Sequence, residues 1–138
     1  MTRYLTVEDA VRQAARHGFV MRDVGLFAAA IQRPAQSVFG EDAYKTLCEK
    51  AAAMCQSLDH SQSLLDGNKR MAWVLTKLFL LINGRLIVAD HAAGADFMLD
   101  VVAAGRPLDE IAEWLEENSP EVAPPDLGDD GDESGATG

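Results

Sequence analysis

The sequence DGNKR at residues 66–70, followed by the apolar run MAWVLTKLFLLI at residues 71–82, decides the fold of this 138-residue chain. The run is apolar on every face except at Thr76 and Lys77. A helix without a polar face belongs in the middle of a small domain, surrounded by other helices. It ends before Gly84, which can take the left-handed conformation that terminates helices. The stretch therefore predicts a buried central helix with a polar pentapeptide at its N-terminus.

The pentapeptide has the composition of an anion site. Free backbone N–H groups and the positive end of the helix dipole converge at a helix N-terminus. Gly67 would let a ligand approach the backbone, and Lys69 and Arg70 add positive side chains. Asp66 is unfavourable beside a phosphate unless a cation such as Mg²⁺ lies between them. The alternative interpretation is a plain helix start in which Asp66 is the N-cap and the other residues form a solvated turn.

The wider stretch QSLLDGNKR, residues 62–70, resembles the core motif of the Fic/Doc family. That motif consists of histidine, a variable residue, an apolar residue, any residue and then Asp-Gly-Asn-Lys-Arg. Leu64 fits the apolar position, and the last five residues match throughout. Lys69, and Trp73 at the place of a second arginine, indicate the short Doc branch of the family. Gln62 departs from the motif, because it occupies the position of the histidine.

The resemblance implies a specific chemistry. Proteins similar to this one are toxins of bacterial toxin–antitoxin pairs, inhibited by an antitoxin protein, and they transfer a phosphoryl group from ATP to a threonine of elongation factor Tu. The residue at the position of Gln62 acts there as the general base, the residue at Asp66 helps to hold Mg²⁺, and Lys69 takes part in catalysis. The phosphate-binding residues implied for this chain are Gly67, Asn68, Lys69 and Arg70.

Gln62 leaves two classes of function open. The first is a Doc-type kinase, impaired because a glutamine amide cannot accept a proton near neutral pH. The second is a pseudoenzyme or detoxified variant that still binds nucleotide or antitoxin. AMP transfer is a weaker alternative, disfavoured by Lys69 and Trp73. His60 is a candidate substitute base, but a surface histidine at a helix C-terminus is the more common explanation for its position.

The rest of the chain predicts an all-α, compact bundle of about six helices. Thr6 and Asp9 resemble a capping box, and Asp23 and Asp90 are further candidate caps. We expect helices from Thr6 to Gly18 and over 24–31, 41–59, 71–82, 90–104 and 107–118.

A loop with extended character separates the second and third expected helices. It falls where Doc-like proteins carry a flap that docks the target segment by strand-like pairing. A plain connector is the alternative. The residues of this predicted target-docking flap are Arg33, Pro34, Ala35, Gln36, Ser37, Val38 and Phe39.

Charge is distributed unevenly along the chain. The formal net charge is −10, and residues 119–138 contribute six acidic residues and no Lys or Arg. We therefore expect a helical domain over 1–118 and a disordered acidic tail over 119–138. An acidic body disfavours nonspecific nucleic-acid binding. Without a signal peptide or membrane span, and with Cys48 and Cys55 too far apart to pair, the sequence predicts a cytoplasmic protein.

Overall fold

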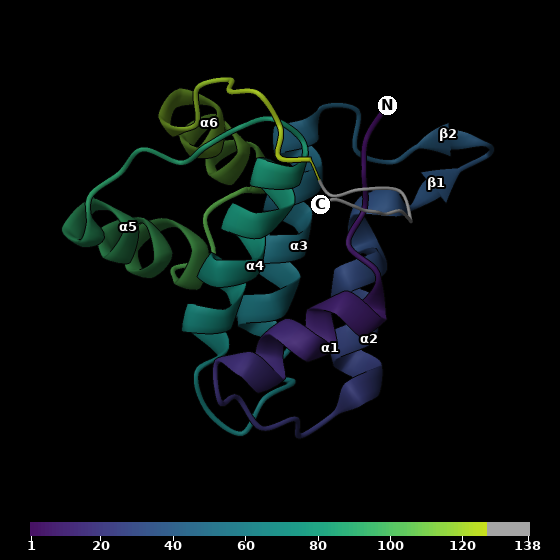
Figure 1. Cartoon of the computed structure of the whole chain (residues 1–138), viewed down its shortest axis with the longest axis vertical. Helices are drawn as coiled ribbons and strands as arrows, with labels where there is room; N and C mark the ends of the chain where they lie inside the picture. Colours follow the sequence, from purple (N-terminus) through teal and green to yellow (C-terminus); the bar gives the residue numbers. More distant parts are fainter. Residues whose placement is uncertain (127–138) are drawn as a thin grey trace.

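The computed structural model describes residues 1–126, and this part of the chain is mostly helical with only a small two-stranded hairpin, which confirms the predicted all-α bundle (Figure 1). The elements are α1 Val7–Arg16, α2 Val24–Gln32, η1 Arg33–Ala35, β1 Ser37–Val38, β2 Glu41–Asp42, α3 Leu47–His60, α4 Asn68–Ile82, α5 His91–Phe97, η2 Met98–Ala103 and α6 Leu108–Asn118. The three-residue 3₁₀ turn η1 extends α2, the π-helical segment η2 extends α5, and β1 and β2 pair antiparallel.

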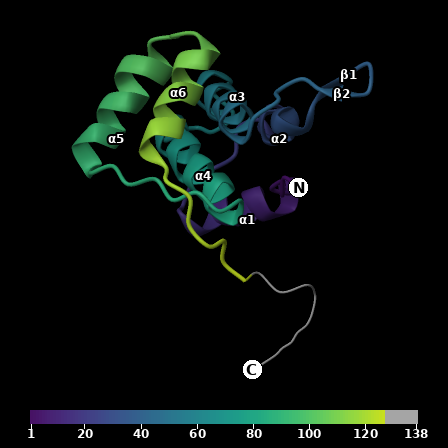
Figure 2. The same cartoon turned by 90° about the horizontal axis from the view of Figure 1, so that it is seen from above.

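The centre of the bundle is the pair of helices α3 and α4 (Figure 2). In α3 the consecutive residues 51–55 are all fully buried. Three of them are alanines, and small side chains let neighbouring helices approach on several sides. In α4, Leu75 and Phe79 face the core, whereas Trp73 and Leu78 are only partly buried. The apolar run thus forms a central helix, as predicted, but it shares the centre with α3.

Side-chain caps determine where the helices begin. Thr6, Asp23 and Asp90 accept hydrogen bonds from the first turns of α1, α2 and α5, as their positions predict. The expected helix over 41–59 begins later, at Leu47, because Thr46 and Glu49 form a capping box. Glu41 and Asp42, at the expected start of this helix, form strand β2 of the hairpin instead.

The segment predicted as a flap is this hairpin and its base. Its tip projects from the body, with Phe39 fully exposed, and Phe39 and Gly40 take positive φ angles of 52° and 80° in the turn (Figure 1). The base is anchored: Pro34 is buried, and the Arg33 guanidinium donates to Tyr44 Oη, to Gln56 Oε1 and Ser57 Oγ and to the carbonyl oxygen of Ala53.

The buried ammonium of Lys50 fixes the other arm of the hairpin. It donates to Asp42 Oδ2 at 3.0 Å and to the Tyr44 carbonyl at 2.6 Å. Of the predicted flap residues, Arg33 and Pro34 therefore hold the hairpin to the body, and the other five, Ala35 to Phe39, are exposed.

The packed body continues past the predicted boundary at residue 118. Ser119 is fully buried, and its hydroxyl donates to the Leu115 carbonyl and accepts from Arg85 Nε. Beyond it, Leu86 N–H donates to the Pro120 carbonyl and Val122 N–H donates to the Gly84 carbonyl. The first residues of the expected tail are thus hydrogen-bonded to the segment after α4. Residues 127–138, the remainder of that tail, lie outside the described residues.

Within residues 1–126, no helix combines the length and the apolar character that crossing a membrane requires.

Candidate functional site

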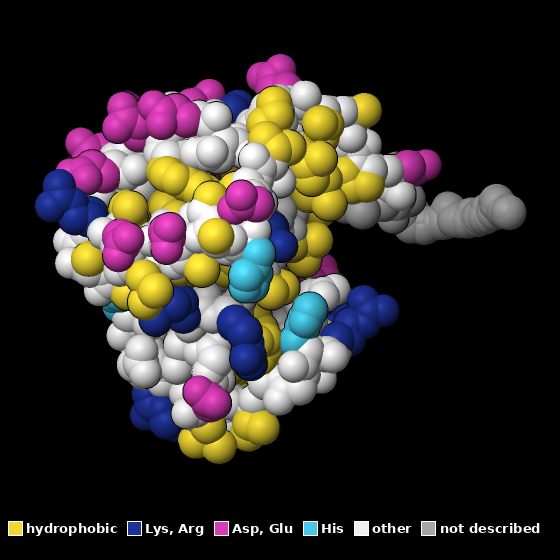
Figure 3. All heavy atoms as spheres, turned by 90° about the vertical axis from the view of Figure 1, so that its left-hand side faces the viewer, with side chains coloured by type: hydrophobic (Ala, Val, Ile, Leu, Met, Phe, Trp, Pro, Cys, Tyr) yellow, Lys and Arg dark blue, Asp and Glu magenta, His cyan; other side chains and the backbone are white. Residues whose placement is uncertain are grey.

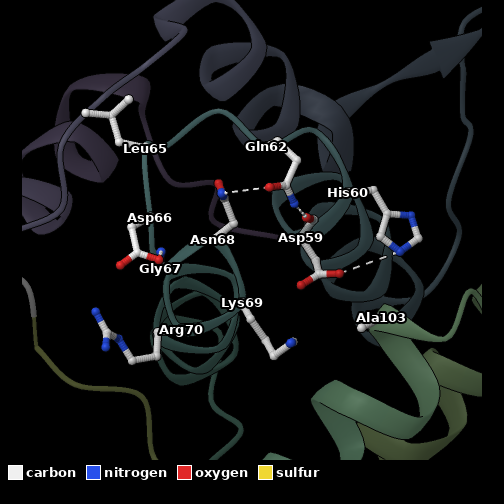
Figure 4. Close-up of a pocket in the computed structure, with 10 residues that line it drawn as sticks. All are labelled: Asp59, His60, Gln62, Leu65, Asp66, Gly67, Asn68, Lys69, Arg70 and Ala103. Atoms are coloured by element: carbon white, nitrogen blue, oxygen red, sulfur yellow. Dashed lines mark hydrogen bonds and ion pairs between the residues drawn. The ribbon is translucent and has the colours of Figure 1, made fainter.

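A cleft of about 590 Å³ opens at the N-terminus of α4 (Figure 4). The first backbone N–H groups of a helix have no acceptor within the helix, so this end of α4 presents donors and a positive dipole. The end of α3 and the last residue of η2 line its other sides. Its lining residues are Asp59, His60, Gln62, Leu65, Asp66, Gly67, Asn68, Lys69, Arg70 and Ala103.

The side chain of Asn68 clamps the loop that leads into α4. Its Oδ1 accepts from Leu64 N–H at 3.0 Å, and its Nδ2 donates to the Leu64 carbonyl at 3.2 Å. Asn68 is almost buried, so the loop rather than a ligand occupies its amide. Its backbone N–H, at the first position of the helix, remains available to an anion.

Gly67 lines the cleft, and the fold of the loop requires a glycine at this position. It precedes α4 with a φ of +83°, in the left-handed region, and a Cβ there would lie 2.4 Å from Cε1 of Phe19. Its N–H donates to Asp66 Oδ1 at 2.8 Å. That this glycine gives a ligand access to the backbone stays a prediction; the geometry shows that the missing side chain also makes room for the Phe19 ring.

The segment between α1 and α2 holds the loop from the outside. Arg22 N–H and Asp23 N–H both donate to the Ser63 carbonyl, and Leu65 N–H donates to the Val20 carbonyl. The Arg22 guanidinium also donates through Nε, at 2.8 Å, and through Nη2 to the main-chain carbonyl of Gln62. Sequence analysis did not identify Arg22, because the contact joins residues 40 positions apart.

Gln62 stands in a left-handed conformation, with a φ of +56°. Its Nε2 donates to the Asp59 carbonyl at 2.9 Å, and its Oε1 accepts from Asn68 Nδ2 at 3.3 Å (Figure 4). The side chain therefore joins the end of α3 to the start of α4. An amide in this position both donates and accepts, which a neutral imidazole can also do, but it has no basic nitrogen.

Asp59 and His60 bring a carboxyl group and an imidazole to the same cleft. Burial raises the pKa of the Asp59 carboxyl, and the charges of His60 and Lys69 oppose the shift. His60 Nε2 lies 2.9 Å from the Val102 carbonyl and 3.6 Å from Asp59 Oδ2. The bond to Val102 requires a proton on Nε2, which leaves Nδ1 as the acceptor in the neutral ring.

Sequence analysis passed over Asp59, although a signal for it exists. It lies four residues after Cys55 and eight after Ala51, on the buried face of α3. A carboxyl group at a position with core spacing is unusual, because ionised groups are rarely buried without a partner.

Positive side chains gather at the cleft. Lys69 is partly buried, and Arg70 is exposed, with its guanidinium 5.1 Å from the centre of the Phe19 ring. On the face that carries α5, Lys and Arg side chains lie in the middle and at the edges, and acidic side chains lie along the upper edge and across the middle (Figure 3). Lys69 and Arg70 thus bring positive charge to the cleft although the chain as a whole is acidic.

The side chains of the cleft can hold a metal ion only together with a bound ligand that supplies further oxygen atoms. Among residues 1–126, no three His, Cys, Asp or Glu side chains are arranged to hold an ion. Mg²⁺, however, commonly takes one or two carboxylates, with phosphate oxygens and water as the other ligands. Asp66 is exposed at the cleft, and its second oxygen is not engaged by Gly67. A Mg²⁺–nucleotide complex thus fits these residues, and an isolated metal ion does not.

The structure brings the predicted residues of the 62–70 motif to one cleft: Gln62, Asp66, Gly67, Asn68, Lys69 and Arg70. The flap residues do not line it. Arg33 and Gln36 instead line a neighbouring hollow of about 380 Å³, and His60 lies in the walls of both cavities. His60 therefore lies between the cleft and the hollow at the base of the hairpin.

Comparison with known proteins identifies the family. The model of the Fic/DOC family matches residues 3–80, which include α1, the hairpin, α3 and the 62–70 motif. A protein of Mycolicibacterium smegmatis named "Toxin Doc" is 43% identical over 120 residues, which cover 83% of this chain and 92% of that protein. The match thus reaches beyond the motif to nearly the whole helical body, and the chain belongs to the Fic/DOC family.

Proposed function

We propose that this protein is a Doc-type toxin of a toxin–antitoxin pair that phosphorylates a translation factor, elongation factor Tu, from ATP. The observation that carries the proposal is the cleft at the start of α4, which joins the helix N-terminus, Lys69 and Arg70 in a cavity of about 590 Å³. A volume of this size suits a small-molecule ligand. Similarity to a protein named "Toxin Doc" supports the toxin class and, with it, an antitoxin partner.

Different residues of the cleft would meet the different requirements of phosphoryl transfer. That reaction depends mainly on positioning and on neutralising phosphate oxygens. The amides at the start of α4, Lys69 and Arg70 supply positive charge, and Asp66 would hold Mg²⁺, which would neutralise further phosphate charge. Asn68 and Arg22 keep the loop in place.

The remaining requirement is a proton acceptor. When the threonine oxygen bonds to the γ-phosphorus, the bond to the leaving ADP oxygen breaks and the hydroxyl proton must be taken up. Gln62 can orient the hydroxyl but cannot take the proton. Loss of a positioned base costs on the order of 10²- to 10⁴-fold in rate. We therefore propose a slow kinase.

A second candidate is a protein that binds nucleotide or antitoxin without turnover. The observation in its favour is that both ends of the Gln62 amide are occupied, by Asp59 and Asn68. In that case Gln62 serves only to join α3 to α4.

The test compares the protein with Gln62→His and Gln62→Asn, each incubated with Mg²⁺, ATP labelled at the γ-phosphate and elongation factor Tu. Histidine and asparagine both tolerate the left-handed backbone of this position, so the pair differs mainly in the basic nitrogen. We expect Gln62→His to accelerate transfer by about 10²- to 10⁴-fold and Gln62→Asn to leave it slow.

Two outcomes would contradict this proposal. If Gln62→His folds and binds ATP but modifies no translation factor, the non-catalytic binder is the correct function. If the unmodified protein transfers phosphate rapidly and His60→Ala abolishes transfer, His60 is the base and Gln62 has no effect on proton uptake.

A further inference from the structure

One carboxyl group in the cleft has no hydrogen-bond donor. The side chain of Asp59, near the end of α3, is 9% exposed, and its Oδ2 lies 3.6 Å from His60 Nε2, which is longer than a hydrogen bond. Among residues 1–126, no N–H or O–H group donates to either of its carboxylate oxygens. Burying an ionised carboxylate without a donor is unfavourable. The packing of α3 therefore gains nothing from a carboxyl group at this position.

The carboxyl group of Asp59 points into the cleft, between the side chains of Gln62 and Lys69 (Figure 4). Gln62 is joined to the same residue, because its Nε2 donates to the Asp59 carbonyl oxygen at 2.9 Å. Lys69 lies on the first turn of α4, where phosphates would bind. Asp59 thus lies between the residue that replaces the motif histidine and the residues that would hold the phosphates.

We propose that Asp59 accepts the hydroxyl proton in the slow reaction of this protein, in place of the base that Gln62 does not supply. The inference rests on the proposed function. The threonine oxygen bonds to the γ-phosphorus, the bond from that phosphorus to ADP breaks, and ADP leaves with the electron pair. The hydroxyl proton moves to Oδ1 of Asp59, and the carboxyl group returns it to water after the products have left.

His60 is less well placed than Asp59 to take this proton. Its Nε2 donates to the Val102 carbonyl at 2.9 Å, and its other ring nitrogen lies on the side of the ring away from Asp59 (Figure 4). Oδ1 of Asp59, by contrast, is engaged by no donor among residues 1–126. Burial also raises the pKa of the Asp59 carboxyl, which makes it a stronger base than an exposed aspartate.

The rate should depend on pH through Asp59, because only the ionised carboxylate can accept a proton. Burial raises its pKa above the ordinary value of 3.8, and the charges of His60 and Lys69 oppose the shift. The rate should therefore rise as the pH rises through the folded-state pKa and become constant above it. The charged and titratable groups around Asp59 are His60 and the Cys55 thiol on α3, Lys69 and Arg70 on α4 and Asp66 in the loop, while η2 adds only Ala103 to the cleft.

The experiment combines Asp59→Asn with Gln62→His and measures transfer of the γ-phosphate of ATP to elongation factor Tu. With Gln62 in place, Asp59→Asn should lower kcat by about 10²-fold, at the lower end for a general base because Asp59 does not occupy the motif position. It should also remove the dependence on pH. With Gln62→His, the same substitution should cost far less, because the imidazole takes the proton there.

A matched control and a binding measurement separate catalysis from other effects. Asp100→Asn removes an exposed carboxyl group of η2 that does not line the cleft, and it should leave the slow transfer unchanged. Titration calorimetry with Mg²⁺–ATP needs no acceptor protein. Because Asp59→Asn removes a negative charge near Lys69, it should bind ATP at least as tightly as the unmodified protein does.

Three results would overturn the inference. They are slow transfer that a folded Asp59→Asn leaves unchanged, a loss of the same size with Gln62 and with Gln62→His, and undetectable transfer by the unmodified protein. In each case, transfer by Gln62→His leaves the proposed function standing. Transfer by neither the unmodified protein nor Gln62→His would refute the proposed function and this inference together.

Discussion

Substitution of Gly67 by alanine tests how the loop before α4 is built. The glycine has a φ of +83°, and an added Cβ would lie 2.4 Å and 2.7 Å from two carbons of the Phe19 ring. Real Cβ atoms do not approach other atoms so closely, so the ring must move. It packs against the core on the inside, and Arg70 lies over it. Gly67→Ala therefore combines backbone strain with displacement of a packed side chain.

The two contributions can be separated in magnitude. A left-handed conformation costs a non-glycine residue about 1–2 kcal/mol. Forcing extra volume into packed surroundings costs a further 1–3 kcal/mol, approximately. Gly105 supplies the matched control, because it has a φ of +77° and nothing within 4 Å of its added Cβ. We expect Gly105→Ala to lower the free energy of unfolding by about 1–2 kcal/mol, and Gly67→Ala by about 2–5 kcal/mol.

Urea unfolding of both variants measures the difference, and a double-mutant cycle with Phe19→Ala assigns it to the ring. In the Phe19→Ala background the cost of Gly67→Ala should fall to that of Gly105→Ala. The reasoning is refuted if the two glycine variants lose the same stability, or if removal of the Phe19 ring leaves the gap between them unchanged.

Two further predictions concern the buried carboxyl group and the C-terminal segment. Burial raises the pKa of Asp59 above its ordinary value of 3.8, so the folded protein holds this proton more tightly than the unfolded chain, and stability is lost as the pH rises through the folded-state pKa. Thermal melts across pH should thus show Asp59→Asn gaining stability over the unmodified protein as the pH rises above about 4, and an advantage that is the same at every pH would contradict this. A chain that ends at Asn118 loses the hydrogen bonds made by Ser119, Pro120 and Val122, each worth about 0.5–1.5 kcal/mol. It should melt at a lower temperature than a chain that ends at Asp126, and equal melting temperatures would show that these contacts contribute nothing.

The helices of this protein could be predicted because their signals are local. Thr6, Asp23 and Asp90 cap the helices that follow them, and the apolar spacing along α3 and α4 identifies their buried faces. The start that was furthest from the structure, at Glu41, also had a local signal, the capping box of Thr46 and Glu49. The family could be recognised for the same reason, since its motif is continuous in sequence.

Contacts between distant segments could not be predicted in this way. The hydrogen bonds of Arg22 to the Gln62 carbonyl, and the contact of Phe19 with Gly67, join the segment after α1 to the motif loop. Neither an apolar periodicity nor a capping residue in the sequence predicts these contacts. The same holds for the packing of residues 119–122 on the segment after α4, which a composition rich in Pro, Gly and acidic residues argued against.

The sequence by itself determined the all-α class, most helix boundaries and the family, because caps, apolar periodicity and a contiguous motif act between residues a few positions apart. The residues that the motif assigned to a nucleotide site stay a prediction about function, although they share one cleft. Only the tertiary structure decided that Gly67 makes room for Phe19, that Asn68 clamps its own loop, and that Asp59 reaches the same cleft as Lys69. These depend on how α3, α4 and the segment after α1 pack together, and a side chain's environment is set by that packing rather than by its neighbours along the chain.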